Sequence, residues 1–220
     1  IFSDEKKRIN DFLLDWNNRF LDLIKYYSKK KKSYILIGSV PRKSKNNKFF
    51  NRSLVVDPNG EIVSSYDKIN LFDVFLSKKE KYFESRNYDS GKKISISRLP
   101  WGNLGMTICY DLRFPFLYKK LAKKGAHFFS VPAAFTYTTG ITHWESLLRA
   151  RAIENGCYVF APAQCGYHDN GRRTFGNSMI IDPWGTILKR AKHSIGSISC
   201  NIDLEKVNFY RKRIPAMTEY

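Results

Sequence analysis

The sequence predicts an α/β fold in which mixed β-sheets are covered by helices. Segments with apolar residues at every third or fourth position alternate with short apolar runs, a pattern typical of helices and buried strands in turn. Two segments place a strand on each side of a four-residue turn, DPNG at 57–60 and DPWG at 182–185. Such hairpins exclude a purely parallel sheet, so mixed sheets stacked face to face, with helices outside, fit the pattern.

The first predicted element is an amphipathic helix over 4–27. A buried strand is expected at 34–40, and a polar loop follows it at 43–48. A hairpin over 52–66 and strands over 93–97 and 103–109 complete this half of the chain. The apolar residues of the helix recur at helical spacing and are expected to form one buried face: Ile9, Phe12, Leu13, Trp16, Phe20, Leu23, Ile24 and Tyr27.

The second half begins with a predicted helix over 115–124, because proline is favoured in the first turn of a helix. A second helix is predicted over 139–156. Thr142 and Glu145 are expected to form a capping box at its start, and Gly156 is expected to close it. The other predicted elements are strands at 126–132 and 157–163, a hairpin at 175–191, a strand at 196–203 and a closing helix at 204–214.

The composition is that of a globular protein with a sizeable core. The chain has 220 residues, of which 43% are hydrophobic, and this excludes general disorder and favours one domain over 1–220. No apolar run approaches the ~20 residues needed to span a bilayer, and the first residues lack the apolar core of a signal peptide. The four cysteines show no CxxC spacing and the four histidines no HxxxH pair, so we expect no metal, no membrane partner and a cytoplasmic location.

The net charge of +18 is high enough to suggest a nucleic-acid partner. The basic residues, however, fall in separate clusters at 29–32, 42–48 and 78–81, and no known nucleic-acid-binding motif accompanies them. Charge of this kind influences solubility and non-specific contacts rather than chemistry. We therefore expect no nucleic-acid partner.

The segment TICYDLRFP, residues 107–115, raises the question of a catalytic cysteine. Cys109 ends an apolar run and comes shortly before the helix that Pro115 starts. A thiol near its free pKa of about 8.5 is a poor nucleophile at neutral pH. The N–H groups of a following helix favour a thiolate or an oxyanion, whereas a cysteine that ends a buried strand often only packs in a core. The residues alone leave both interpretations open.

Four segments, in order along the chain, resemble the nitrilase superfamily of carbon–nitrogen hydrolases. They are SYDKINLFDV at 65–74, TICYDLRFP, the long segment at 134–166 and FGNSMIIDPWGTIL at 175–188. They are most similar to the deaminated-glutathione amidase and ω-amidase branch, and AQCG at 163–166 favours the first of these. The resemblance implies a four-layer α-β-β-α sandwich with two mixed β-sheets. It also implies a small carboxylate-bearing amide as substrate, no cofactor, and a homodimer or higher even-numbered oligomer.

The resemblance also implies catalytic roles. Cys109 would be the nucleophile of a Glu-Lys-Cys triad, forming a thioester after ammonia leaves. Lys68 would be the triad lysine and would stabilise the oxyanion together with the backbone N–H of Tyr110. Glu84 falls where a second glutamate is expected, and would orient the lysine or relay protons. The side chains of Cys109, Lys68 and Glu84 are therefore expected to converge.

Instead of being catalytic, Lys68 and Glu84 could each be a solvated charge at the surface. The flanking Tyr66 and the pair Leu71-Phe72 indicate that Lys68 lies on a buried segment. Glu84 lies in a charged stretch that would ordinarily be at the surface.

Further residues are candidates for substrate binding. Arg113 either anchors a substrate carboxylate or pairs with Asp111 or a buried carboxylate. For His143, Trp144 and Glu145 a functional and a structural role are equally open. By the resemblance, the substrate-binding candidates are Tyr110, Arg113, Phe135 and Thr139. The remaining cysteines are expected in or near the core: Cys157, Cys165 and Cys200.

The chain departs from the family pattern at its start. The family's first glutamate, the general base, follows the first strand, usually in a Pro-Glu dipeptide, whereas none of the eight prolines here precedes a glutamate and Glu5 is a weak substitute. The chain begins with Ile1, so we expect an upstream strand-helix unit that carries the base. A smaller departure is Phe116, where the branch usually has an acidic residue. The alternatives are an ω-amidase, a carbamoyl-amide hydrolase, or a non-catalytic nitrilase-like interaction module.

Overall fold

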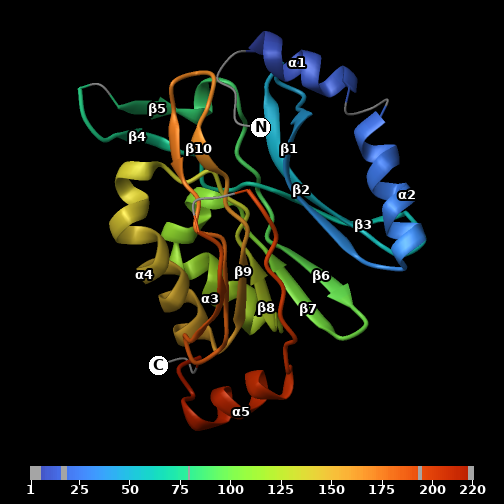
Figure 1. The fold of residues 1–220 in the computed structure, drawn as a ribbon, viewed down its shortest axis with the longest axis vertical. Helices are drawn as coiled ribbons and strands as arrows, with labels where there is room; N and C mark the ends of the chain where they lie inside the picture. Colours follow the sequence, from blue (N-terminus) through green and yellow to red (C-terminus); the bar gives the residue numbers. More distant parts are fainter. Residues whose placement is uncertain (1–5, 16–18, 79, 193–194, 218–220) are drawn as a thin grey trace. The chain divides into compact units, whose positions relative to one another are not determined.

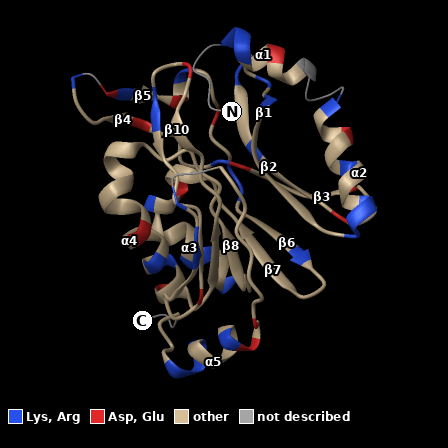
Figure 2. Ribbon diagram, viewed as in Figure 1, with Lys and Arg blue, Asp and Glu red and all other residues tan. Residues whose placement is uncertain are grey.

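The computed structural model describes residues 6–15, 19–78, 80–192 and 195–217 (Figure 1). These residues form two compact units, which cover 1–97 and 98–220. The boundary falls within strand β6 (Ser95–Leu99). Lysine and arginine are distributed over the helices and strands of both units (Figure 2). The single-domain assignment stays a prediction.

The first unit is built on an antiparallel three-stranded sheet with the order β1-β2-β3. Its strands are β1 (Ile35–Lys43), β2 (Phe49–Val56) and β3 (Ile62–Asp67), and its helices are α1 (Lys6–Asp15) and α2 (Leu21–Lys31). The predicted DPNG turn is confirmed between β2 and β3, where Asp57 Oδ1 accepts hydrogen bonds from the N–H groups of Asn59 and Glu61. Gly60 adopts φ +78, which glycine allows without strain.

The core of the first unit lies between the helices and the sheet. Ile37, Val40, Leu54 and Val56 form its buried centre, and Phe12 and Ile24 from the helices pack against it. A second cluster joins α1 to the end of the sheet through Ile9, Leu13, Phe49 and Tyr88.

The single predicted helix over 4–27 is wrong in one respect, because the described residues place two helices in this span. Leu21 and Ile24 of α2 pack against the core cluster. They lie three residues apart and therefore on the same side of the helix. Phe20, just before α2, and Leu23 and Tyr27 are 39%, 49% and 44% exposed, although they were expected to be buried. Residues 4, 5 and 16–18 of the predicted helix, Trp16 among them, lie outside the described residues.

A short hairpin and a helical turn follow the first sheet. They are β4 (Asp73–Phe75), β5 (Lys81–Phe83) and the 3₁₀ turn η2 (Glu84–Arg86). None of them was predicted, because the strands have only three residues and their side chains are largely exposed, so no period of buried residues marks them.

The second unit contains a six-stranded mixed sheet with the order β13-β12-β9-β8-β7-β6. Strands β7, β8 and β9 run parallel, whereas β12 is antiparallel to both β9 and β13. The prediction of mixed strand directions is therefore confirmed. The other strands of this sheet are β7 (Gly102–Met106), β8 (Phe128–Ser130), β9 (Tyr158–Ala161), β12 (Met179–Ile181) and β13 (Ile187–Arg190). A separate hairpin consists of β10 (Cys165–Tyr167) and β11 (Arg173–Phe175).

Three helices belong to the second unit, and two of them, α3 (Pro115–Lys123) and α4 (Tyr137–Asn155), pack against each other (Figure 1). Gly156 ends α4 in the left-handed conformation at φ +55, as predicted. The third helix, α5 (Glu205–Arg213), confirms the predicted closing helix, and Arg211 ties it to the backbone oxygens of Ala126 and Asn155. Among the described residues, no helix combines the length and the apolar character that crossing a bilayer requires. The cytoplasmic location stays a prediction.

Two predicted features of the second unit are wrong. The capping box does not form, because α4 already begins at Tyr137 and Thr142 lies inside it, while the Glu145 carboxylate pairs with Arg149 and Arg190. The predicted strand over 196–203 is not formed. Exposed and partly buried residues do alternate along this segment, but a strand also needs a hydrogen-bonded neighbour.

Candidate active site

Cys109 lies at a sharp turn in the second unit. Strand β7 ends at Met106, three residues before the end of the predicted strand, and Cys109 begins the 3₁₀ turn η3 (Cys109–Arg113). Ile108 is extended, whereas Cys109 adopts φ +49, in the left-handed region that costs a residue with a side chain roughly 1–2 kcal/mol. Backbone strain of this kind persists where the surroundings hold it, and is found disproportionately at functional sites. The side chain of Cys109 is partly exposed.

Hydrogen bonds on both sides of Cys109 hold this turn. The N–H of Cys109 donates to the carbonyl oxygen of Pro132 at 3.0 Å. The buried carboxylate of Asp111 accepts the N–H of Ile108 at 3.0 Å, and the N–H of Asp111 returns to the carbonyl of Ile108 at 3.1 Å. Arg151, from α4, donates to the carbonyl oxygen of Leu112 at 2.9 Å.

Sequence reasoning did not assign a role to Asp111 or Arg151 at this turn. Asp111 had a local signal, because an acidic residue three positions after Ile108 can reach back to that residue's N–H. Arg151 had none, since 39 residues separate it from Leu112.

Arg113 lies beside Cys109 and against aromatic rings. Its guanidinium carbon is 5.2 Å from the centre of the Phe135 ring and 6.0 Å from that of Tyr110. Both Nη atoms are 3.2 Å from Nδ1 of His143. Burial lowers the pKa of Arg113, and the negative forms of Tyr110 and Cys109 oppose that effect. The structure therefore groups Cys109, Tyr110, Arg113 and Phe135.

Thr139 lies on the first turn of α4, where its hydroxyl is 2.7 Å from that of Thr136. Nearby, Gly140 approaches the Phe175 side chain so closely that an added Cβ would lie 2.4 Å from it. This close approach explains why glycine occupies that position of the helix.

The residues His143, Trp144 and Glu145 divide between the two roles that were left open. Trp144 is fully buried, and its Nε1–H donates to the carbonyl oxygen of Asn177 at 2.8 Å, which is a structural role. Glu145 forms its ion pairs at the surface. Two of the three contact candidate site residues: His143 contacts Arg113, and the Trp144 ring packs against that of Phe135.

Lys68 and Glu84 form a buried ion pair in the first unit. Their side chains are 1% and 0% exposed, and Lys68 Nζ lies 2.5 Å from Glu84 Oε2. The same carboxylate accepts the N–H of Phe72 at 2.7 Å and the Nδ2–H of Asn51 at 3.1 Å. The prediction that Lys68 lies on a buried segment is confirmed, and the surface interpretation of Glu84 is wrong.

Strand pairing and a close backbone contact fix the position of Lys68. Its N–H donates to the carbonyl of Asn51, and its own carbonyl accepts the N–H of Gly91 at 2.8 Å. A Cβ on Gly91 would lie 2.1 Å from the carbonyl oxygen of Asp67, so only glycine fits there without a backbone shift. Lys68 and Glu84 belong to the first unit and Cys109 to the second, and their convergence stays a prediction.

The other cysteines show no comparable turn. Cys157 is fully buried, as predicted, and burial raises the pKa of its thiol to about 12, although the nearby Arg211 opposes this. Cys165 and Cys200 are partly buried. Within the described part of the chain, no three histidine, cysteine, aspartate or glutamate residues are grouped to hold a metal ion.

Known proteins resemble the chain along most of its length. A family model described as carbon-nitrogen hydrolase matches residues 7–212. The deaminated glutathione amidase of Yersinia enterocolitica is 42% identical over 187 residues, which cover 84% of this chain and 65% of the relative. The deaminated glutathione amidase of Dictyostelium discoideum is 40% identical over 215 residues, which cover 96% of this chain and 74% of the relative.

A solved structure shows the same fold. The crystal structure of the Caenorhabditis elegans NitFhit protein matches 98% of this chain and 53% of its own, with a TM-score of 0.91 and 34% identity. This likeness confirms the predicted nitrilase-like α-β-β-α fold class. The chain spans just under two thirds of the length of the Yersinia relative. Because the family model covers almost all of its residues, the chain belongs to the carbon–nitrogen hydrolase family.

Proposed function

We propose that the protein is an amidase that hydrolyses a small carboxylate-bearing amide, with deaminated glutathione as the substrate, to an acid and an amine, which is ammonia where the amide is primary. The names of the Yersinia and Dictyostelium relatives support this substrate, and membership of the hydrolase family supports the reaction. The observation that carries the proposal is the conformation of Cys109. Hydrogen bonds keep its backbone in the left-handed region, and its partly exposed thiol lies at the start of η3.

The chemistry at Cys109 is a two-step acyl transfer. Its sulfur attacks the amide carbonyl carbon, a C–S bond forms, and the carbonyl oxygen becomes an oxyanion. Collapse of this intermediate breaks the C–N bond, and the departing nitrogen takes up the proton lost by the thiol. The amine, or ammonia from a primary amide, then leaves, and a thioester remains. Water then attacks the thioester, the C–S bond breaks, and the thiol regains a proton. Amide and water are consumed, and acid and amine are formed.

Lys68 and the N–H of Tyr110 would stabilise the oxyanion in this scheme. Removing one such donor typically costs about 10² to 10³ in rate. The Glu84 carboxylate accepts hydrogen bonds from Lys68, Phe72 and Asn51, and these contacts fix it in place. These three contacts support a positioning role for Glu84, which holds the ammonium, rather than a proton relay.

Arg113 would bind the carboxylate of the substrate. A guanidinium presents a planar fork of N–H donors that suits a carboxylate. Here the fork lies against Phe135 and Tyr110, while the Asp111 carboxylate accepts the N–H of Ile108. The position of the fork beside Cys109 and these rings supports the anchoring role.

We also propose that the protein forms a homodimer or a larger even-numbered assembly through α3 and α4. Phe116 on α3 is 80% exposed and Ile141 on α4 is 61% exposed, and these helices pack against each other. Exposed apolar side chains of this kind mark interaction surfaces when they cluster. Light scattering should report an even-numbered oligomer at micromolar concentration, and a monomer would contradict the proposal.

The decisive test measures hydrolysis by the complete gene product of three amides: deaminated glutathione, followed by release of cysteinylglycine, and an ω-amide and a carbamoyl amide, followed by release of ammonia. We expect deaminated glutathione to give the highest kcat/KM, Cys109→Ala to abolish turnover, and Cys200→Ser, a matched change at a partly buried thiol, to preserve it. A higher kcat/KM for the ω-amide or the carbamoyl amide would identify the corresponding alternative enzyme. Absence of hydrolysis of all three would favour the interaction module.

A further inference from the structure

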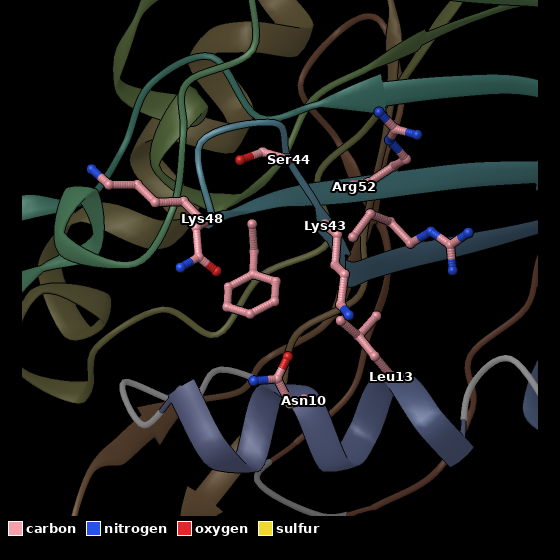
Figure 3. A pocket seen from close by; sticks show the side chains of 9 residues that line it. Asn10, Leu13, Lys43, Ser44, Lys48 and Arg52 are labelled. Carbon is pink, nitrogen blue, oxygen red and sulfur yellow. The ribbon is translucent and has the colours of Figure 1, made fainter.

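The first unit contains a cavity between α1 and the β1–β2 hairpin, here called the hairpin cavity (Figure 3). Its volume is about 680 Å³, within the range of roughly 300–1,000 Å³ that is typical of small-molecule sites. In Figure 3, Asn10 and Leu13 approach it from α1, and Lys43 extends from the hairpin toward that helix. The lining residues are Asn10, Leu13, Arg42, Lys43, Ser44, Asn47, Lys48, Phe49 and Arg52.

The hairpin cavity is strongly positive. Four of its lining residues are lysine or arginine, and none of the described residues that line it is acidic. The positive charge of Arg52 is compensated by Asp67, because Nε and Nη2 of Arg52 lie 2.6 and 2.8 Å from the carboxylate oxygens of Asp67. Arg42 is partly buried, and its pKa is lowered by burial and, to a smaller extent, by repulsion from Arg52. An anion in the cavity would relieve this repulsion.

The remaining lining residues suit a compact ligand. Asn10 and Asn47 supply neutral polar groups, whereas the Ser44 hydroxyl donates to the Asp89 carboxylate at 2.6 Å. Leu13 and Phe49 form an apolar floor that belongs to the cluster beneath α1. Arginine and lysine together suit phosphate groups, because the guanidinium binds two oxygens at once and the ammonium acts as a point charge.

The hairpin cavity and the Lys68–Glu84 pair involve different residues. Phe49 lines the cavity and Asn51 hydrogen bonds with Glu84, and both lie on the same face of β2 because they are two positions apart. Arg52 lies on the other face, so residues from both faces of the hairpin line the cavity.

We infer that the hairpin cavity binds a small molecule with two or more linked phosphate groups. Cations from both strands of the hairpin line one hollow, through Arg42 and Lys43 on β1 and Arg52 on β2. Linked phosphates carry several charges over a short length and can contact all of them at once. A single carboxylate is too short to contact all of these cations at once.

Isothermal titration calorimetry of the complete gene product with inorganic tripolyphosphate tests this inference. Arg42→Gln and Lys43→Gln should each weaken binding about tenfold, as expected for loss of one charge-assisted contact. Lys31→Gln, an exposed lysine at the end of α2, is the matched control and should leave the affinity unchanged. Circular dichroism should show that each variant remains folded.

Three results would overturn the inference. Absence of tripolyphosphate binding would exclude the site. An equal loss in Lys31→Gln would show that only the general positive charge attracts the anion. Citrate binding as tight as that of tripolyphosphate would exclude linked phosphates as the preferred chemistry. A nucleoside triphosphate that binds more tightly than tripolyphosphate would support the inference and show that the apolar floor contributes.

Discussion

Replacing Glu84 by glutamine keeps the shape of this side chain but removes the negative charge that faces the Lys68 ammonium. Both side chains are almost fully buried, and their charged atoms lie 2.5 Å apart. Neutralising one member of such a pair leaves the other buried without a counter-charge, which costs about 3–5 kcal/mol. This is a large share of the roughly 5–15 kcal/mol by which a domain is stable.

The opposite substitution, Lys68→Met, should cost less. It leaves the Glu84 carboxylate with two donors, the N–H of Phe72 and the amide of Asn51. We expect a loss of about 1.5–3 kcal/mol, the value of a hydrogen bond to a charged group. The double variant removes both charges, so its loss should fall short of the sum of the single losses by more than about 1 kcal/mol.

Equilibrium urea unfolding at neutral pH gives all three free energies, with Glu61→Gln as the matched control. Glu61 is exposed in the turn between β2 and β3, so its substitution should change stability by less than about 0.5 kcal/mol. The reasoning is refuted if Glu84→Gln costs no more than Glu61→Gln, or if the two losses in the double variant simply add.

Three further predictions follow from single contacts. Arg113→Gln should raise KM for the carboxylate-bearing amide by about 10- to 150-fold with little change in kcat, through loss of a charge-assisted contact, and an unchanged KM would exclude the anchoring role. Gly91→Ala places a Cβ 2.1 Å from the carbonyl oxygen of Asp67 and should cost about 1–3 kcal/mol in urea unfolding, whereas Gly196→Ala, in open space, should cost little. Burial raises the pKa of the Cys157 thiol from 9.0 to about 12, so the folded state holds this proton more tightly, and stability should fall as pH rises from 9 toward 12. Thermal melts of Cys157→Ala should lack this part of the pH dependence, and identical profiles for the two proteins would contradict the assignment.

Features specified by neighbouring residues could be predicted from the sequence. Both Asp-Pro-x-Gly turns form as expected, because Asp57 and Asp182 each accept two backbone N–H groups within their own turn. The start of α3 at Pro115 and the end of α4 at Gly156 also depend on local conformational preferences.

Features that depend on distant contacts could not be predicted. Thr142 and Glu145 fit a capping box, but α4 continues upstream to Tyr137, where Thr136 and Thr139 are buried. The role of Asn51 beside Glu84 has no local signal, since 33 residues separate them. The burial of Lys68 was predictable from its apolar neighbours, whereas the positive φ of Cys109 required the structure.

Trapping of the acyl-enzyme tests the central claim, that Cys109 is the nucleophile, most directly. The complete gene product is mixed with deaminated glutathione, quenched in acid during turnover, digested and analysed by peptide mass spectrometry. We expect the peptide that contains Cys109 to carry the acyl group of the substrate, and this modification to be absent from Cys109→Ala. An acyl group on any other residue, or continued hydrolysis by Cys109→Ala, would contradict the account.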